Sequence, residues 1–315
     1  MLIVQPHVGV ILVNYNGYED TTACINSLLQ LNYSSKTIYV VDNQSPDGSG
    51  ERLHSWIKNK QSKELKFIQS KDNLGFSGGN NLAMKEALKD GVQYVWLINN
   101  DTEVDSNALL KMVSALTEDN KIGMAGSKIY YYNSDLLWYA GGYFNSLGLP
   151  RHRGLDEQDA KNTLYNELSE TDFITGCSLL VKAELIQQIG MLDDDFFMYY
   201  EDAEWSLRAK KNGWKLVYVP ESIVWHKVGS STGREKKDHS PIIEYYDIRN
   251  NIFFIKKVYS NAEKIIPTFT IVLKLVKKHV RLVISQETRK KEKLAMIYQG
   301  LYDAMVGNKG LLKKK

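Results

Sequence analysis

Asp101 is the first candidate for chemistry in this sequence, because it ends the polar run Asn99-Asn100-Asp101 directly after an apolar stretch, residues 92–98. Such a stretch is apolar enough for a strand buried on both faces, so its polar end is expected where the chain leaves the core. Asp101 could cap the next turn, bind a cation, or do both. His226 ends another apolar stretch, a setting that no other histidine here shares. It is therefore the candidate second ligand of a divalent cation, although a single histidine also fits an ordinary core or surface position.

Glu201 and Asp202 form an acidic pair after a run of aromatic residues, at the start of a predicted helix. Acidic side chains stabilise the N-terminus of a helix electrostatically, which is one explanation of the pair. The other is a general base, a carboxylate that takes the proton of a hydroxyl group as that hydroxyl attacks a substrate. One member of the pair can cap the helix while the other catalyses.

Three glycines, Gly75, Gly78 and Gly79, lie in a loop that leads into a helix, within residues 72–81. Glycines let a ligand approach the backbone closely, and a helix N-terminus favours a diphosphate. The spacing differs from the dinucleotide-binding fingerprint, and the loop follows the third predicted strand rather than the first. The alternative is a tight turn with positive φ, which explains one glycine better than three.

Asp42 ends the second predicted strand and is followed by Asn43. An acid at this position can accept hydrogen bonds from a ribose hydroxyl or from a base N–H. It can equally cap the turn that begins at Asn43. Spacing alone does not decide between these interpretations.

The elements that would position these residues alternate between strands and helices over the first 130 residues. Apolar runs predict strands at residues 8–14, 37–43, 65–70 and 92–99, and amphipathic patterns predict helices at 18–31, 49–60 and 77–91. This alternation predicts an α/β protein with a mostly parallel sheet, in which ligands bind beyond the carboxyl ends of the strands.

The pattern changes after residue 130. The remaining elements are predicted as a hairpin at 129–148, a strand at 172–183, a helix at 199–214, extended chain at 215–227 and helices from 241 onward. Between them, residues 228–240 combine glycines with serines and charged residues. This segment is expected to be either a lid that orders over a bound ligand or a plain surface loop.

The composition is that of a globular protein, since 43% of the 315 residues are hydrophobic and 24% are charged. Cys24 and Cys177 are too few and too far apart to predict a disulfide framework or a zinc site. The first residues carry no basic leader, so no signal peptide is expected and the predicted location is cytoplasmic.

Positive charge is concentrated in the last part of the sequence. Residues 263–315 contain 13 Lys and Arg against 4 Asp and Glu, a net charge of +9, which leaves −6 for residues 1–262 because the whole chain has +3. No stretch is long and apolar enough to span a bilayer. The basic, amphipathic tail predicts contact with the inner face of the cell membrane. A dimerisation helix, a solvated basic end, or a stripe packed on the domain are the alternatives.

Eight segments of this sequence, in order, resemble the inverting family 2 glycosyltransferases of the GT-A fold. They are "VILVNYNG", "VVDNQSPDGS", "NLGFSGGNN", "WLINNDTEV", "TGCSLLVK", "FFMYYEDAEWSLRAKKNGW", "VWHKVGSST" and "YYDIRN", and they span residues 8 to 250. The branch most similar is the rhamnosyltransferase-like one that acts on bacterial surface polysaccharides. The resemblance implies a Rossmann-like, mostly parallel sheet flanked by helices, with a C-terminal helical extension.

The resemblance also implies a division of the chain and roles for single residues. Residues 1–130 would bind the nucleotide-sugar donor, 131–240 would hold the acceptor and the catalytic residues, and 241–315 would form the C-terminal helices. The implied nucleoside-binding residues are Val13, Asn14, Tyr15 and Asp42, and the implied donor-pocket residues are Asn73, Phe76, Asn80, Asn99 and Asn100. The remaining implied roles are Asp101 and His226 as metal ligands, Asp202 as base with Glu201 beside it, Gly176 and Trp205 near the acceptor, and Tyr246 and Arg249 near the diphosphate.

Many members of the wider superfamily carry an Asp-x-Asp motif where this chain has Asn99 and Asp101, and the Asn-x-Asp form is ordinary in the branch that it resembles. The implied function is the metal-dependent, inverting transfer of a sugar, with Mg²⁺ or Mn²⁺, from dTDP-rhamnose or a UDP-hexose to a hydroxyl of a glycan or lipid-linked acceptor. No nucleic-acid partner is expected, and a homodimer is left open.

Two other functions are weighed against this one. A sugar-phosphate nucleotidyltransferase would carry a glycine-rich, basic loop after the first strand, where this chain has "VNYNGYED". A non-catalytic module that binds nucleotide sugars would not need Glu201 and Asp202. A dehydrogenase is disfavoured because its fingerprint is absent.

Overall fold

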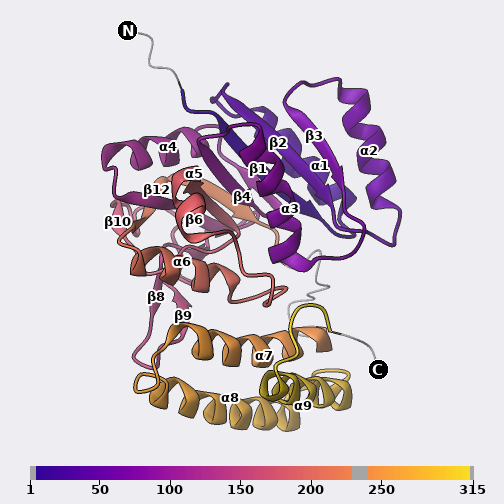
Figure 1. Ribbon diagram of the computed structural model, residues 1–315, viewed down its shortest axis with the longest axis vertical. Coiled ribbons are helices and arrows are strands. Elements are labelled where there is room, and N and C mark those ends of the chain that lie inside the picture. Colours follow the sequence, from indigo (N-terminus) through magenta and orange to yellow (C-terminus); the bar gives the residue numbers. More distant parts are fainter. Residues whose placement is uncertain (1–4, 229–239, 313–315) are drawn as a thin grey trace.

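The computed structural model describes residues 5–228 and 240–312. One large sheet forms the centre of the domain (Figure 1). Its strands follow the order β10-β12-β6-β11-β4-β1-β2-β3, with β5 beside β12 and β7 beside β6. The strands of the first half are β1 (Val8–Asn14), β2 (Lys36–Asp42), β3 (Leu65–Gln69), β4 (Tyr94–Ile98) and β5 (Thr102–Val104). Strands β1 to β4 pair in parallel, as the alternation of elements predicts.

Helices cover both faces of this sheet, which is why its central strands are apolar throughout. The helices of the first half are α1 (Tyr18–Leu29), α2 (Ser49–Lys60), α3 (Gly75–Lys89) and α4 (Ala108–Glu118). On one face, side chains of α1 and α4 pack with alternate residues of β1 such as Val10. On the other face, α3 and two later helices pack with the intervening residues such as Ile11. Alternate side chains of one strand thus enter two separate cores.

The second half extends the same sheet. Its strands are β6 (Ile122–Tyr131), β7 (Leu137–Tyr139), β8 (Gly142–Phe144), β9 (Pro150–His152), β10 (Ser169–Glu170), β11 (Ser178–Lys182) and β12 (Lys215–His226). Strand β11 is antiparallel to both β4 and β6, while β12 runs parallel to β6. The predicted hairpin is confirmed, since β6 and β7 pair in antiparallel fashion. Helices α5 (Ala183–Ile189) and α6 (Glu201–Lys211) cover one face.

Three helices form a separate layer below the sheet (Figure 1). They are α7 (Pro241–Val258), α8 (Ile265–Ile284) and α9 (Lys290–Val306), and they confirm the prediction that the chain is helical from residue 241. Within the described ranges, no helix combines the length and the hydropathy that crossing a membrane requires.

Among the predicted boundaries that differ from the structure, two lie near the predicted site. The strand expected at 172–183 begins only at Ser178, because the residues before it form a turn closed by a hydrogen bond from Ser178 N to Thr175 O. The helix expected at 199–214 begins at Glu201, because the aromatic residues before it adopt positive φ. The predicted lid at 228–240 falls almost wholly on residues 229–239, which lie outside the described part of the chain.

Candidate active site

Asp101 and His226 meet at one edge of the sheet although 125 residues separate them. The chain turns after β4 into β5, and β5 pairs with the end of β12 so that Thr102 lies opposite His226. His226 Nε2 is 3.1 Å from Asp101 Oδ1, and both side chains are buried. Asn99 adds an amide nitrogen 3.5 Å from the same imidazole atom. The structure therefore brings together the predicted pair.

The chemistry and spacing of this pair fit a divalent cation. Two adjacent ligands of an octahedral ion with bonds of about 2.1 Å lie about 3.0 Å apart, close to the separation of His226 Nε2 and Asp101 Oδ1. The imidazole packs edge-on against Trp138, with ring centroids 4.6 Å apart. Its Nδ1 atom has no hydrogen-bond partner among the described residues. That part of the chain contains no group of three or more His, Cys, Asp or Glu side chains suited to a metal, so this pair leaves most coordination positions to other oxygens.

A short turn at residues 175–178 connects this pair to the acidic pair of α6. The amide of Gly176 donates a hydrogen bond of 2.9 Å to Asp202 Oδ2. The carbonyl of the next residue, Cys177, accepts a hydrogen bond of 3.0 Å from the amide of Asn99. Asp202 and the Asn99–Asp101 turn thus lie on two sides of one main-chain turn.

Gly176 also brings an aromatic ring to the same place. A Cβ atom added there would lie 2.8 Å from the Phe76 ring and 3.7 Å from Asp202 Cβ, so only glycine lets these groups come so near. Phe76 is partly exposed at the start of α3. Three residues predicted from separate segments, Phe76, Gly176 and Asp202, are therefore neighbours.

The two acids of the pair differ in accessibility. Glu201 is only 5% exposed, and its Oε2 atom has no hydrogen-bond partner within the described residues. Burial, together with the neighbouring Asp202, raises the pKa of Glu201 well above its ordinary value. Burial also raises the pKa of Asp202, against the opposing effect of hydrogen bonds from the amides of Gly176 and Ala203. Asp202 is partly exposed whereas Glu201 is buried, so Asp202 is the more accessible acid of the pair.

The segment before this pair is held in a strained conformation. Phe197, Tyr199 and Tyr200 have φ values of 66°, 71° and 74°, which cost about 1–3 kcal/mol for each non-glycine residue. Asn250 on α7 binds three of its carbonyls through Nδ2, at 2.7 Å to residue 196, 2.6 Å to residue 198 and 3.2 Å to residue 199. The strained segment, residues 195–200, is thus fixed from the helical layer.

Arg249 belongs to the same anchor, which corrects its predicted position near the diphosphate. Its guanidinium is buried and donates 2.8 Å and 2.6 Å hydrogen bonds to the carbonyls of Phe196 and Gly310. Tyr246 is likewise taken up inside the protein, since its ring stacks on Phe197 with centroids 5.1 Å apart and an interplanar angle of 14°. Both residues support the strained segment instead of facing a ligand.

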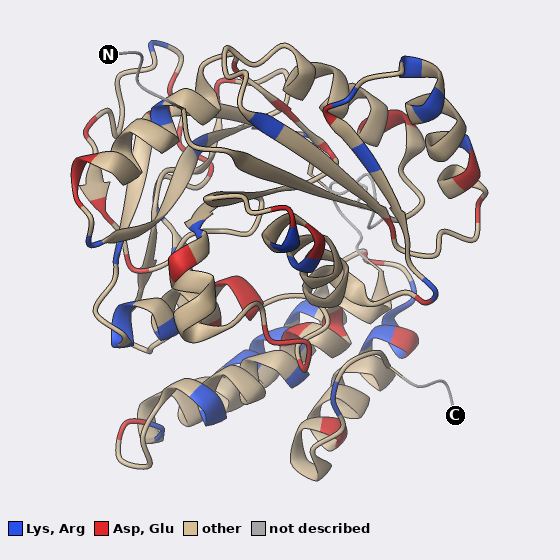
Figure 2. Ribbon diagram, turned by 45° about the horizontal axis from the view of Figure 1, so that its top comes forward, with Lys and Arg blue, Asp and Glu red and all other residues tan. Residues whose placement is uncertain are grey.

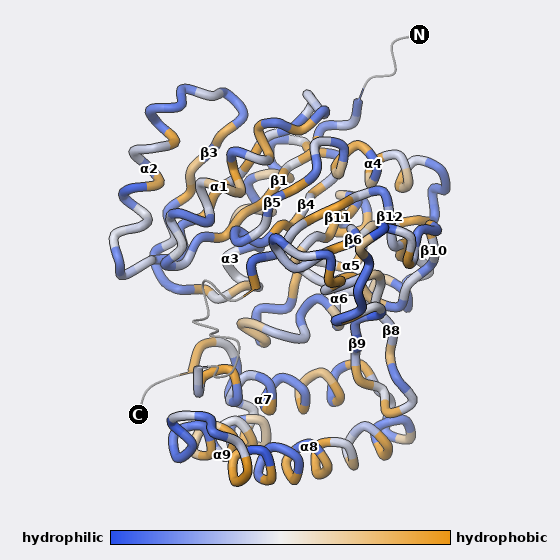
Figure 3. Tube along the Cα trace, turned by 180° about the vertical axis from the view of Figure 1, so that it is seen from behind, coloured by the Kyte–Doolittle hydropathy of each residue, from blue (hydrophilic) through white to orange (hydrophobic). Residues whose placement is uncertain are grey.

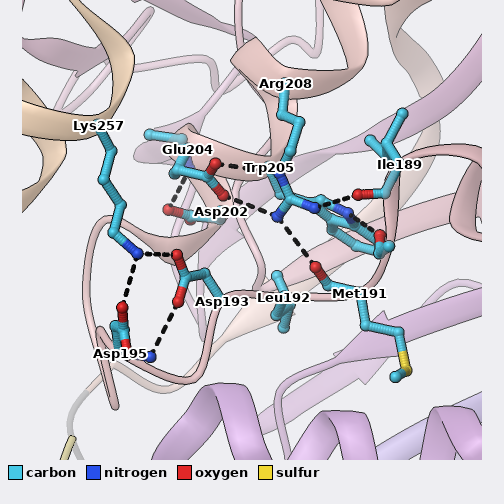
Figure 4. Close-up of polar contacts among 12 residues, drawn as sticks. Ile189, Met191, Leu192, Asp193, Asp195, Asp202, Glu204, Trp205, Arg208 and Lys257 are labelled. Atoms are coloured by element: carbon cyan, nitrogen blue, oxygen red, sulfur yellow. Dashed lines mark hydrogen bonds and ion pairs between the residues drawn. The ribbon is translucent and has the colours of Figure 1, made fainter. Parts of the chain in front are cut away.

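The environment of Trp205 also differs from the prediction that this residue lies near the acceptor. Its side chain is 0% exposed, and its indole N–H donates to the carbonyl of Gly190 at 2.9 Å. Figure 4 shows the surrounding contacts, in which Arg208 binds Glu204 and the carbonyls of Ile189 and Met191. These bonds attach α6 to the chain that precedes the strained segment, where Lys257 binds Asp193 and Asp195.

The glycine loop packs against protein, so the prediction that its helix N-terminus faces a diphosphate is wrong. The amides of Phe76 and Ser77 both donate to the carbonyl of Phe197, at 2.7 Å and 3.3 Å. Gly75 has a φ of 68°, and a Cβ there would lie 2.4 Å from the same carbonyl oxygen. Gly78 and Gly79 are required for close approach to Leu74 and Val13, where a Cβ would come within 2.7 Å and 2.9 Å. One turn glycine and two packing glycines explain the loop.

Amide side chains join this loop to the end of β2. Asn43 donates to Asn73 Oδ1 at 3.1 Å and to the carbonyl of Gly75 at 3.0 Å. Asn80 is buried and donates to the carbonyl of Phe76 at 2.8 Å. Asn73 and Phe76 remain partly exposed, so of the three predicted pocket residues these two can face a ligand.

Asp42 caps its turn, which corrects the prediction of a direct bond to a nucleoside. Its carboxylate accepts four hydrogen bonds, from Asn14 at 2.8 Å, from the Ser45 hydroxyl at 2.7 Å and amide at 3.2 Å, and from Gln69 at 2.9 Å. Four donors occupy the acceptor positions of both oxygens. The side chain of Asn14 is also used in hydrogen bonds within the protein, because its Oδ1 accepts a hydrogen bond of 2.9 Å from the Thr21 hydroxyl.

The remaining predicted residues lie along the same edge of the sheet. Asn100 donates to Thr21 Oγ1 at 2.9 Å and so ties the chain after β4 to the first turn of α1. Val13 and Tyr15, at and just beyond the end of β1, are partly exposed. Sequence reasoning gave no role to Asn250, and the adjacent amides Asn250 and Asn251 within a predicted helix were the signal for it.

Comparisons with known proteins agree on a single family. Residues 9–190 match the family model described as glycosyl transferase family 2. The low-salt glycan biosynthesis hexosyltransferase Agl10 of Haloferax volcanii is 23% identical over 260 residues, which cover 81% of this chain and 77% of that protein. The dTDP-rhamnosyl transferase RfbF of Shigella flexneri is 22% identical over 306 residues, 92% of each chain.

A solved structure agrees at the level of the fold. The mannosyltransferase PcManGT of Pyrobaculum calidifontis, in complex with GDP-Man and Mn²⁺, superposes with a TM-score of 0.59 at 14% identity, covering 98% of this chain and 77% of that one. The predicted GT-A fold is therefore confirmed.

Proposed function

This chain belongs to glycosyl transferase family 2 and is a glycosyltransferase, and we propose that it transfers a sugar from a nucleotide-diphosphate donor with inversion at the anomeric carbon. The observation that carries this proposal is the turn at residues 175–178, because it has an accessible carboxylate, Asp202, on one side and the Asp101–His226 pair near the other. A base and a site for the leaving diphosphate are what this reaction needs at close range.

Asp202 is the proposed general base. It accepts the proton of the acceptor hydroxyl while the oxygen of that hydroxyl forms a bond to the anomeric carbon. The bond from that carbon to the diphosphate oxygen breaks on the opposite face, and the diphosphate leaves with the electron pair. Direct displacement needs no covalent intermediate. The raised pKa of Asp202 makes this carboxylate a stronger base than an exposed one.

Asp101 and His226 are the proposed holders of Mg²⁺ or Mn²⁺, with Asn99 beside them. When bound, such an ion offsets the negative charge that develops on the departing diphosphate. Because these two side chains supply only one carboxylate and one imidazole, the diphosphate itself would complete the site. We therefore expect little metal binding in the absence of nucleotide. The Mn²⁺ in the mannosyltransferase structure supports the use of a divalent cation.

The donor would extend from this pair along the edge formed by the ends of β1 and β2. Val13, Tyr15, Asn73 and Phe76 are the partly exposed residues proposed to contact it, with the acceptor over Gly176. Asn14, Asp42, Asn80 and Asn100 would shape this edge from within through the hydrogen bonds described above. Residues 1–130 would thus bind the donor and residues 131–240 the acceptor.

The donor sugar is proposed from the names of the relatives. A dTDP-rhamnosyl transferase and a hexosyltransferase are both similar over most of the chain, which supports rhamnose or a hexose as the sugar, and the donors proposed are dTDP-rhamnose or a UDP-hexose. The acceptor would be a hydroxyl of a glycan or lipid-linked saccharide in the synthesis of bacterial surface polysaccharide.

A donor panel tests the proposal. Thermal shift and release of nucleoside diphosphate are measured with dTDP-rhamnose, UDP-glucose, UDP-galactose and GDP-mannose, each with MnCl₂, MgCl₂ or EDTA. We expect one donor to raise the melting temperature only when a divalent ion is present.

Calorimetry of donor binding then tests the metal ligands in solution. The Asp101→Ala variant is expected to lose Mn²⁺-dependent donor binding, whereas Glu118→Ala, an exposed acid at the end of α4, keeps it. Equal donor affinity of Asp101→Ala and the parent with Mn²⁺ would rule out Asp101 as a ligand.

A further inference from the structure

Helix α8 turns an apolar face away from the protein. Its exposed large hydrophobic residues are Ile265, Ile266, Phe269, Val272, Leu273, Val276, Val280, Val283 and Ile284. At 3.6 residues per turn these positions fall within an arc of about 120°. Figure 3 shows the hydrophobic positions recurring along the side of α8 that faces away from the sheet. We call these nine residues the apolar face of α8.

The opposite side of α8 binds α7 through charged groups. Lys274 lies 2.5 Å from Asp247 Oδ1, and Lys278 lies 2.8 Å from Asp247 Oδ2. Lys278 and Arg281 both bind the carboxylate of Glu244, which is fully buried. Four ionic contacts therefore fix the rotation of α8 about its axis.

This arrangement is the reverse of the usual one in a globular domain. An amphipathic helix on a protein surface ordinarily packs its apolar stripe on the core and exposes its charged side. Here most of the cationic side chains of α8 face the protein, and only a few apolar residues, such as Ile271 and Leu282, are buried there. The stripe does not pack on the domain, so that alternative is wrong. Large contiguous apolar surface of this kind marks a contact site.

The charge around the apolar face indicates what covers it. Helix α8 contains four Lys and Arg and no Asp or Glu, and three of these four cations are paired with acids of α7. Lys277 is exposed directly beside the apolar face, and Arg289 and Lys291 are exposed at the start of α9. Figure 2 shows Lys and Arg recurring along these lower helices. An anionic surface would complement this positive border.

Helix α9 adds exposed aromatic residues at the same side. Tyr298 contacts α8, since its hydroxyl lies 2.9 Å from His279 Nε2, and Tyr302 and Met305 are exposed further along α9. Tyrosines favour the boundary between apolar and polar surroundings, as found at the level of lipid headgroups.

We propose that the apolar face of α8, with the exposed side of α9, lies on a lipid bilayer that carries anionic headgroups. Apolar residues enter the boundary between headgroups and acyl chains while the basic residues bind the headgroups, which is how interfacial helices bind. A two-fold contact between copies of this chain would bring the same positive border against itself, which favours the lipid surface. This inference deepens the proposed function, because an enzyme docked on the bilayer would meet a lipid-linked acceptor at the same surface. That consequence rests on the proposed function, whereas the docking surface itself does not.

Vesicle flotation of the full chain tests the proposal. The vesicles are phosphatidylcholine alone, or phosphatidylcholine with about one third phosphatidylglycerol. We expect the parent to float with the anionic vesicles and much less with the neutral ones. The double variant Val276→Asp/Val280→Asp, at two exposed positions of the apolar face, is expected to lower the floated fraction about tenfold or more.

A matched control separates the apolar face from net charge. Ser55→Asp/Asn59→Asp adds the same two negative charges at exposed positions of α2, away from α8, and is expected to float like the parent. Circular dichroism checks that both variants fold. If the parent floats with neither vesicle, or if the two double variants lose flotation equally, the proposal is overturned.

Two further measurements distinguish the outcomes. Light scattering after gel filtration reports the oligomeric state. If the parent is a dimer that does not float, and Val276→Asp/Val280→Asp is a monomer, this face is an interface between copies and the proposal is overturned. Release of nucleoside diphosphate in the presence of a soluble saccharide acceptor is measured on the same variants. If the parent floats but turns over no donor, the proposed function is wrong and the docking surface is supported. If the parent turns over a donor but does not float, the docking surface is wrong and the proposed function is supported.

Discussion

Two carboxylates, Asp42 and Asp202, were both expected to act on a ligand, and the structure places them in opposite environments. Asp42 lies at the end of β2 and accepts four hydrogen bonds, from Asn14, Ser45 and Gln69. Asp202 lies at the start of α6, is partly exposed, and accepts bonds from two main-chain amides. Its neighbour Glu201 is buried with an oxygen that has no partner among the described residues.

The difference separates a structural acid from a reactive one. Four donors occupy the two oxygens of Asp42, so this carboxylate serves to hold its turn. Burial raises the pKa of both Glu201 and Asp202, and for Glu201 the neighbouring Asp202 adds to this effect. A carboxylate that is costly to keep charged is a better proton acceptor, which is the property a general base needs.

The largest effect is expected from Asp202→Asn. We expect kcat to fall about 10²- to 10⁴-fold, because the amide cannot accept the acceptor's proton, while the donor Kd changes by no more than a few fold. Steady-state turnover and calorimetry with the donor measure the two quantities. Glu184→Gln, an exposed acid on α5, serves as the control and should behave like the parent. Turnover of Asp202→Asn within a few fold of the parent would assign the base elsewhere.

Arg249→Met is expected to have the next largest effect. Carbonyls of Phe196 and Gly310 lose a charged donor, and we expect the free energy of unfolding to fall by about 3 kcal/mol, measured by urea denaturation. Arg249→Lys keeps the charge without the fork of donors and should lose less. If Arg249→Met unfolds like the parent but binds the donor poorly, Arg249 contacts the diphosphate after all.

Glu201→Gln is expected to change how stability depends on pH. In the parent, the unfolded chain releases the proton of Glu201 near its ordinary pKa of about 4.3, while the native state retains it up to the raised pKa. Stability is therefore lost as pH rises through that window, by at most about 1.4 kcal/mol per pH unit, and the Gln variant lacks this loss.

Urea denaturation between pH 4 and pH 8 measures this difference. The stability of Glu201→Gln relative to the parent should rise with pH over the window. Curves that stay parallel for the two proteins would mean that Glu201 ionises normally in the native state.

The smallest effect is expected from Asp42→Asn. The variant replaces one of the two acceptor oxygens with an NH₂ group, which cannot accept the hydrogen bonds that the surrounding donors make to Asp42. We therefore expect a loss of about 1–2 kcal/mol in the free energy of unfolding. The donor Kd should stay within a few fold, because the side chain supports the turn from within. A tenfold loss of donor affinity at unchanged stability would contradict this expectation and would indicate that Asp42 contacts the nucleoside directly.

Much of the fold was predictable because it depends on local patterns. The apolar runs of β1, β2 and β4 and the amphipathic helices between them have periods that can be read along the chain. The same applies to the strand ends, where Asn99, Asp101 and His226 were singled out and are found together. Parallel strands place their carboxyl ends at one edge, so topology follows from pattern there.

The roles of single polar residues could not be read in this way. Whether Arg249 meets a diphosphate or a main-chain carbonyl depends on the segment that folds against it, and that segment lies more than 50 positions away. The three glycines show the same limit, because the carbonyl of Phe197 fills the place where a ligand was expected.

Sequence by itself determined the α/β architecture, the family motifs, the acidic pair and the amphipathic character of residues 265–284. Tertiary structure alone decided which carboxylate is satisfied and which is left to react, since burial and hydrogen-bond partners come from distant segments. It also decided which side of α8 faces outward. An amphipathic pattern defines two faces but not their orientation, and here the ion pairs with Glu244 and Asp247 of α7 turn the apolar one away from the protein.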